Sequence, residues 1–189
     1  AQNEEPAGWF KWPIEAHGFF ETRAGYRTQN DKYEKDMSIM ESRFQIDLFS
    51  STDWADFKVK GDFYGDLVTE QGDFDLREAN IFTRPTDWMD MKIGRQILTW
   101  GTGDLVFIND LFPKDYVAFY LGREDEYLKK PSDALRLSLY PKIFNLDFVL
   151  IPFFTPNTLA QGDRLSFFDS FEGSITGRDS QRNAVKPAR

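Results

Sequence analysis

The sequence predicts an all-β protein: an antiparallel transmembrane β-barrel of which about seven strands are visible. Apolar and charged residues alternate with a period of two along most of the chain, which is the pattern of strands with one apolar face. Aromatic residues make up 16% of the 189 residues, yet the mean hydropathy is polar at −0.52. No apolar run reaches the ~20 residues of a membrane-spanning helix. Together these observations favour strands that separate an apolar medium from water.

The composition argues against several classes of function. The net charge of −8 and the lack of a basic stripe argue against nucleic-acid binding. The chain has no cysteine, which excludes disulfides and thiolate metal sites. It has one histidine, His17, and no Gly-x-Ser-x-Gly motif, so a hydrolytic triad or a histidine-based metal site has little support. We therefore predict no enzyme activity, no cofactor and no metal site.

The first three strands alternate regularly and are predicted over residues 15–28, 38–49 and 55–67. In the second strand, one face carries Met40, Ser42, Phe44, Ile46 and Leu48, and the other carries Glu41, Arg43, Gln45 and Asp47. A helix would scatter these charges around its circumference. The fourth strand, residues 74–83, alternates less cleanly, because Arg77 falls on the face that Ala79 and Ile81 make apolar. Its register stays open.

An internal repeat links two turns. Residues 52–59, Thr-Asp-Trp-Ala-Asp-Phe-Lys-Val, are echoed 34 residues later by residues 86–93, Thr-Asp-Trp-Met-Asp-Met-Lys-Ile. Two strands with their connections occupy about that length, so the repeat predicts two equivalent turns on one rim. Trp54 and Trp88 then belong to the aromatic girdle at the membrane interface. The alternative is a soluble β-sandwich with both Trp side chains in its core.

The remaining strands enclose a long loop. We predict a fifth strand over residues 91–100, a loop over 101–131, and strands over 135–140 and 146–153. The repeat aligns Arg95 with an apolar-face position, where a charge in lipid would cost ~2–4 kcal/mol. We expect a bulge at Gly94, or a position at the rim, to turn Arg95 inward. The loop is aromatic-rich and long enough to fold inward and narrow a channel; the alternative is an extracellular cap.

The connections are predicted to alternate in length. They are short after strands two, four and six and longer after strands one, three, five and seven, which is the layout of outer-membrane barrels. Residues 1–14 then form an N-terminal periplasmic segment, 15–157 the barrel strands, and 158–189 an extracellular loop or disordered segment. An eighth strand near residues 165–175 would close a small barrel. Its poor alternation favours the N-terminal part of a larger barrel instead.

Several short motifs in order carry a family resemblance. They are Gly-Arg-Gln-Ile-Leu-Thr-Trp-Gly at 94–101, Asp-Leu-Phe-Pro-Lys-Asp-Tyr at 110–116, and Ile-Pro-Phe-Phe-Thr-Pro-Asn at 151–157. Over about residues 74–157 the chain resembles a family of porin-like outer-membrane proteins of largely unknown function. The resemblance implies a barrel in the bacterial outer membrane and names no substrate. Such barrels usually continue for many more strands than the seven predicted here.

Charges of both signs on the inward faces form the candidate site. We predict a porin-like channel for passive passage of small solutes, surrounded by outer-membrane lipid. The predicted pore-lining and constriction residues are Arg23, Arg43, Lys58, Lys60, Asp62, Lys92, Arg95, Arg136, Asp115 and Tyr116. The same charges could instead form ion-pair ladders in a structural barrel that binds a periplasmic or outer-membrane protein partner. A soluble, carbohydrate-binding β-sandwich is the third hypothesis.

Overall fold

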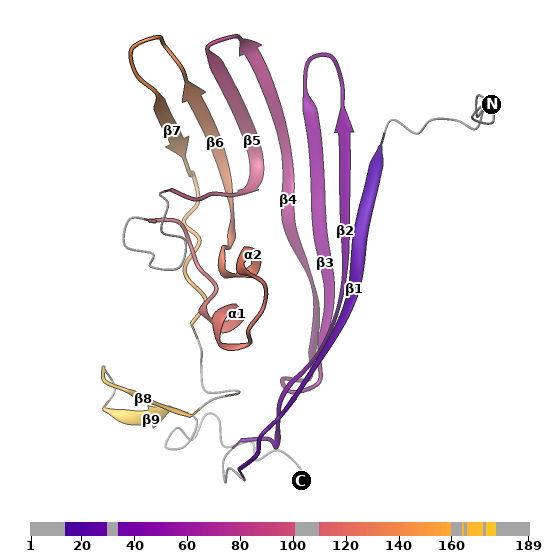
Figure 1. The fold of residues 1–189 in the computed structure, drawn as a ribbon. Helices are drawn as coiled ribbons and strands as arrows, with labels where there is room; N and C mark the ends of the chain where they lie inside the picture. Colours follow the sequence, from indigo (N-terminus) through magenta and orange to yellow (C-terminus); the bar gives the residue numbers. More distant parts are fainter. Residues whose placement is uncertain are drawn as a thin grey trace, which may run out of the picture.

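The computed structural model describes residues 14–29, 34–100, 110–159, 164, 166–171 and 173–176. Within them the chain forms an antiparallel sheet of seven strands in sequence order, followed by a separate two-stranded hairpin (Figure 1). The sheet comprises β1 (Glu15–Tyr26), β2 (Met37–Ser51), β3 (Asp56–Asp66), β4 (Gln71–Thr86), β5 (Met89–Ile97), β6 (Pro131–Leu139) and β7 (Leu146–Leu150). The all-β, antiparallel prediction is confirmed. Among the described residues β1 and β7 do not pair with each other, so these strands do not close a barrel.

The strand boundaries differ from the prediction chiefly at β4 and β6. The predicted longer loop after strand three is wrong, because only residues 67–70 connect β3 to β4. Residues 71–73 extend the ladder by pairing with 64–66, and Glu70 closes the turn with a φ of 56°. The other turns span residues 52–55, 87–88 and 140–145. These three lie together at one end of the sheet (Figure 1, top), which we call the Trp rim.

A β-bulge resolves the uncertain register of the fourth strand. Lys60 pairs with Glu78 but Gly61 pairs with Leu76, so Arg77 is the extra residue of β4. The bulge lets the apolar and polar faces of β4 stay in phase with those of β3 on both sides of Arg77. The predicted bulge at Gly94 is wrong, since β5 pairs there without a register shift.

Gly94 is nevertheless a special position. Its φ is +116°, and an added Cβ would lie 2.3 Å from the Ala79 carbonyl oxygen. The following residue, Arg95, donates from Nε to the Leu76 carbonyl oxygen at 2.5 Å and pairs with Asp133 at 3.6 Å. Gly94 therefore permits a close approach of β5 to β4, and Arg95 is neutralised by pairing.

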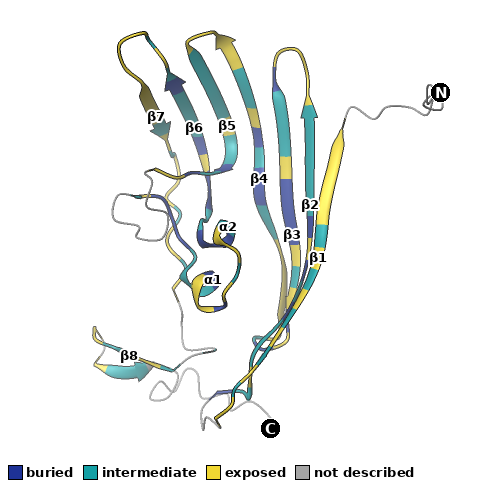
Figure 2. Ribbon diagram, viewed as in Figure 1, coloured by how far each residue is buried: buried dark blue, intermediate teal, exposed yellow. Residues whose placement is uncertain are grey.

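Burial on the sheet is inverted relative to a soluble protein, because apolar side chains are exposed and charged ones are buried. Phe20, Phe44, Phe63 and Phe74 are register partners on four successive strands, and they are between 46% and 70% exposed. Buried positions instead occur mainly on β2, β3, β4 and β6 (Figure 2). Many of them are polar or charged, including Glu41, Arg43, Gln45, Lys60 and Asp62.

Two short helices lie in the connection between β5 and β6. They are α1 (Tyr116–Tyr120) and α2 (Asp125–Leu128). Among the described residues, no helix has the length and apolar character needed to cross a membrane. A small apolar cluster of Leu98, Phe112 and Ala134, with Val149 and Ile151 against it, packs the start of this connection onto β6 and the end of β7.

A short hairpin follows the sheet in the segment that was predicted to be loop or disorder. Its strands are β8 (Phe167–Asp169) and β9 (Ser174–Thr176), and it pairs with no strand of the main sheet. Except for residue 14, the predicted N-terminal periplasmic segment lies outside the described residues, and so do residues 101–109 of the predicted long loop.

Candidate functional site

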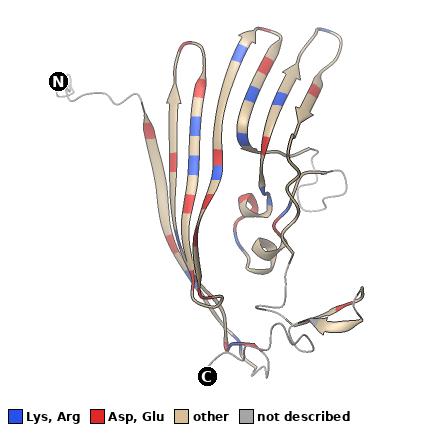
Figure 3. Cartoon of the chain, turned by 180° about the vertical axis from the view of Figure 1, so that it is seen from behind, with Lys and Arg blue, Asp and Glu red and all other residues tan. Residues whose placement is uncertain are grey.

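The candidate site is the contact between the long connection and the polar face of β2, β3 and β4. Figure 3 shows the charged positions that run along these strands. The Lys60 ammonium pairs with the Glu126 carboxylate of α2 at 2.7 Å. The Arg77 guanidinium donates to the carbonyl oxygens of Glu126 and Lys129 at 2.7 and 3.0 Å. The described part of the loop, residues 110–130, therefore folds onto the polar face.

Tyr127 is the centre of this contact. Its ring lies 4.1 Å from the Arg43 guanidinium carbon and 4.9 Å from that of Arg77, so two cations face one aromatic side chain. The Gln45 side-chain amide donates to the Tyr127 hydroxyl oxygen at 2.9 Å. Only 2% of Tyr127 is exposed. Burial and the nearby Asp62 carboxylate raise the pKa of the Tyr127 phenol, so it stays protonated at neutral pH.

Arg43 joins the strands beneath Tyr127. Its two terminal nitrogens donate to Asp62 at 2.7 Å and to Glu41 at 2.9 Å, and Glu21 lies 3.5 Å away. Arg43 is 2% exposed and Asp62 is completely buried. Removing a guanidinium from water costs several kcal/mol unless carboxylates surround it. These carboxylates come from β2 itself and from its neighbours β1 and β3, which explains why the charges of the three strands converge on one point.

The carboxylate of Glu126 ties α2 to the strands. It pairs with Lys60 and also accepts a hydrogen bond from the Gln45 amide at 3.4 Å. Burial acts to raise the pKa of Glu126, but the hydrogen bond and positive charge of Lys60 outweigh it and hold the pKa below its ordinary value of 4.5. Glu126 therefore remains ionised, and its ion pair is intact, at neutral pH.

A second group of charges lies closer to the Trp rim. Glu78 accepts from Lys58 at 2.9 Å and lies 3.6 Å from Lys92, so one carboxylate serves two lysines. Arg136 pairs with Asp147 of β7 at 3.2 Å. These predicted residues share the polar face with Arg43 and Lys60 but do not contact the loop helices among the described interactions.

The other predicted residues occupy separate places. Arg23 pairs with Glu21 at 2.9 Å and donates to the Gly122 carbonyl oxygen at 3.1 Å, so it holds the turn after α1. Asp115 is the N-cap of α1, where its side chain accepts from the Val117 and Ala118 amides. The Tyr116 amide donates to the Thr158 carbonyl oxygen at 2.9 Å. These contacts position the loop.

The two rim tryptophans are exposed. Trp54 and Trp88 sit in equivalent turns of the Trp rim, at 66% and 52% exposure. Trp54 contacts only the edge of the Phe57 ring among the described aromatic pairs, at 5.5 Å. Neither side chain is in a core, in contrast to the soluble-sandwich alternative.

Three central residues were missed or undervalued by the sequence analysis. Alternation gives only a conflict at Arg77, because the bulge that turns it toward α2 has no signature in alternation alone. Within the aromatic-rich loop, the sequence does not distinguish Glu126 and Tyr127 from their neighbours. For Glu126 and Tyr127, the useful sequence feature is an acidic residue directly before an aromatic one, in a loop between strands that carry basic residues.

Comparisons with protein-family models, curated proteins and solved structures found no match to this chain. Within the part of the chain that the structure describes, no group of three or more His, Asp or Glu side chains could hold a metal ion. The functional argument therefore rests on the geometry of the sheet, the loop and their charges.

Proposed function

We propose that this chain forms part of the wall of a β-barrel in the bacterial outer membrane, and that this barrel passes small solutes passively beside the inward-folded loop. The observation that carries the proposal is the inverted burial of the sheet. Exposed apolar side chains cover one face and buried charges the other. A soluble sheet would hide its apolar face, whereas a lipid-facing sheet keeps it outside.

The spacing of the exposed aromatics supports a membrane-sized apolar band. Trp54 lies at the Trp rim, and Phe63, nine residues further along the chain, belongs to the row of four Phe side chains. At about 3.3 Å per residue and a tilt of about 35–45°, that separation gives a height of about 21–24 Å. Outer-membrane barrels have an apolar band ~25 Å tall between two aromatic girdles. Trp54 and the Phe row are suitable members of those girdles.

The proposal requires further strands. In the described residues β1 and β7 each pair with one neighbour, and hydrocarbon does not tolerate unpaired strand edges. The barrel must therefore gain strands beside β1 and β7 in the membrane. This requirement agrees with the expectation that the seven strands are part of a larger barrel.

Conductance tests the channel directly. The full-length protein, purified in detergent and inserted into planar lipid bilayers, should give discrete current steps. Replacing Tyr127 by Ala should increase the conductance of each step, because the loop would leave the polar face. A control variant, Tyr120→Ala, changes an exposed aromatic of the same loop and should conduct like the wild type. A folded, inserted protein that gives no steps would refute the channel.

A structural or partner-binding barrel is the second candidate, and one observation favours it. Arg43, Glu41 and Asp62 are buried, and Arg43 forms ion pairs with both carboxylates, as expected for a barrel interior that is filled and stabilised by ion pairs. Such a barrel would insert into membranes but give no current steps in planar bilayers, and a partner protein would co-purify with it in a fixed ratio. Insertion without conductance, together with that co-purification, would select this function over the channel.

A further inference from the structure

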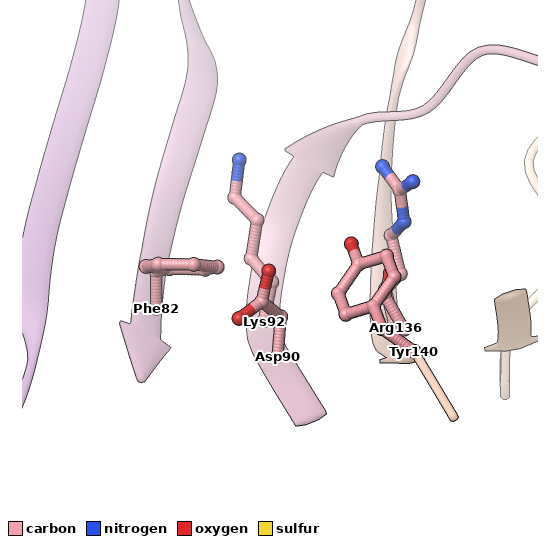
Figure 4. Close-up of a pocket in the computed structure, with 6 residues that line it drawn as sticks. Phe82, Asp90, Lys92, Arg136 and Tyr140 are labelled. Atoms are coloured by element: carbon pink, nitrogen blue, oxygen red, sulfur yellow. The ribbon is translucent and has the colours of Figure 1, made fainter. Parts of the chain in front are cut away.

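Two cationic side chains, Lys92 and Arg136, line a small cavity near the Trp rim. Lys92 and Arg136 are register partners on β5 and β6, so they stand directly opposite each other on the polar face. The cavity has a volume of about 140 Å³ and is also lined by Phe82, Asp90, Ser138 and Tyr140 (Figure 4). Like charges directly opposite on neighbouring strands are destabilising. The pair therefore needs a negative partner.

The neighbouring carboxylates do not saturate these cations. Glu78 is closer to Lys58, at 2.9 Å, than to Lys92, at 3.6 Å. Asp90 accepts from Arg84, at 3.1 Å, and has no described contact with Lys92. Each acid near Lys92 is thus already engaged more closely elsewhere.

Arg136 is only partly satisfied as well. Asp147 accepts from one terminal nitrogen of Arg136 at 3.2 Å and also accepts from the Ser138 hydroxyl. The Arg136 Nε is buried and has no hydrogen-bond partner. A guanidinium can offer parallel donors to a carboxylate or phosphate, and Asp147 engages only one terminal nitrogen of Arg136.

We infer that Lys92 and Arg136 form a binding site for a small oxyanion, a carboxylate or phosphate group of a soluble solute. Arg136 supplies directional donors and Lys92 a mobile point charge, a combination suited to such groups. The Ser138 and Tyr140 hydroxyls line the same cavity. Its volume is sufficient for one such group. The inference rests on the proposed function, since it makes the polar face a lumen, and it names the solutes of that channel as anionic.

Direct binding tests the site without relying on conduction. Inorganic phosphate is titrated into the full-length protein in detergent at constant ionic strength and followed by phosphorus NMR line broadening; acetate is then added as a competitor. The wild type should bind phosphate and release it to acetate. Lys92→Gln and Arg136→Gln should each weaken binding, and the double variant should weaken it at least tenfold.

A matched control separates this site from general charge. Lys142→Gln removes the same charge from the exposed turn between β6 and β7, on the same rim and outside the cavity. It should bind phosphate like the wild type. Equal binding by the double variant and the control, or no binding by the wild type, would overturn the site.

Conductance distinguishes failure of the site from failure of the channel. Current steps with no phosphate binding would overturn the oxyanion site and leave the channel intact. Phosphate binding that depends on Lys92 and Arg136, in a protein that gives no steps, would support the site and overturn passive transport. Far-UV circular dichroism of each variant verifies that the sheet is retained.

Discussion

Replacing Tyr127 by Ala removes the side chain that joins the loop to three strands. Truncating a buried aromatic to Ala costs about 3–5 kcal/mol. Here the loss includes the contacts with two guanidinium groups and the hydrogen bond from Gln45. Tyr127→Phe keeps the ring between the arginines and loses only the hydrogen bond, about 0.5–1.5 kcal/mol. The two variants therefore separate the role of the ring from that of the hydroxyl.

Trypsin cleavage after Arg123 measures this difference. Arg123 lies between the two helices and is held by Glu41 and Asp115, so the loop must leave the sheet before the bond is cut. When opening is fast, the cleavage rate follows the open population. At 1.4 kcal/mol per tenfold, Tyr127→Ala should speed cleavage by about 100-fold or more, and Tyr127→Phe by about tenfold or less.

The matched control is Tyr120→Ala, which truncates an exposed aromatic of the same loop and should change the rate less than about twofold. Mass spectrometry identifies the Arg123 cut among cuts at exposed sites elsewhere. A Tyr127→Ala rate within a few-fold of the wild type, with the sheet intact by circular dichroism, would refute the idea that Tyr127 anchors the loop.

Three further predictions follow from the same geometry. Burial acts to raise the pKa of Glu126, but its lysine partner lowers it. The ion pair therefore stabilises the docked loop fully above pH 4.5 and is lost as the pH falls below that value. Below pH 4.5, amide hydrogen exchange in α2, corrected for its intrinsic pH dependence, should accelerate in the wild type but not in Glu126→Gln. Gly94→Ala should lower the urea midpoint of unfolding, because its Cβ would meet a β4 carbonyl, whereas Gly65→Ala, with open space around it, should change the midpoint little. If the proposed membrane barrel is correct, Val59→Arg, on the exposed apolar face about midway between Trp54 and Phe63, should destabilise the protein in lipid by about 2–4 kcal/mol and Trp54→Arg by about 0–1 kcal/mol; equal small effects would contradict a lipid-facing surface.

Alternation was sufficient to predict the sheet because it is a local property. Residues such as Phe44 and Arg43 occupy opposite faces whatever the strand's neighbours are, so the two faces of β2 and β3 could be predicted from spacing alone. The Thr-Asp-Trp repeat likewise located Trp54 and Trp88 in equivalent turns. Strand ends were less predictable, since residues 71–73 are polar and extend β4 only because β3 offers partners.

Register and long-range contacts could not be predicted in this way. Whether Phe20, Phe44, Phe63 and Phe74 form one row depends on how four strands slide against each other. The bulge at Arg77 determines which residues of β4 face the loop. Alternation showed only that Arg77 falls on the same face as the apolar residues of its strand. Tyr127 finds its place between two arginines 84 and 50 residues away along the chain, through contacts that no short motif encodes.

The inverted sheet explains why the loop and the buried charges form one structural unit. The polar face, opposite the exposed apolar side chains, loses water where α2 covers it, and an uncompensated guanidinium there is unfavourable by several kcal/mol. Strand carboxylates stabilise Arg43 from below, while Tyr127 and the carbonyl oxygens of α2 contact Arg43 and Arg77 from above. Removing the loop would return these charges to water instead of leaving them buried and unpaired. The charges would therefore be satisfied with the loop docked and with the loop released, which is what the proposed constriction would need in order to be reversible.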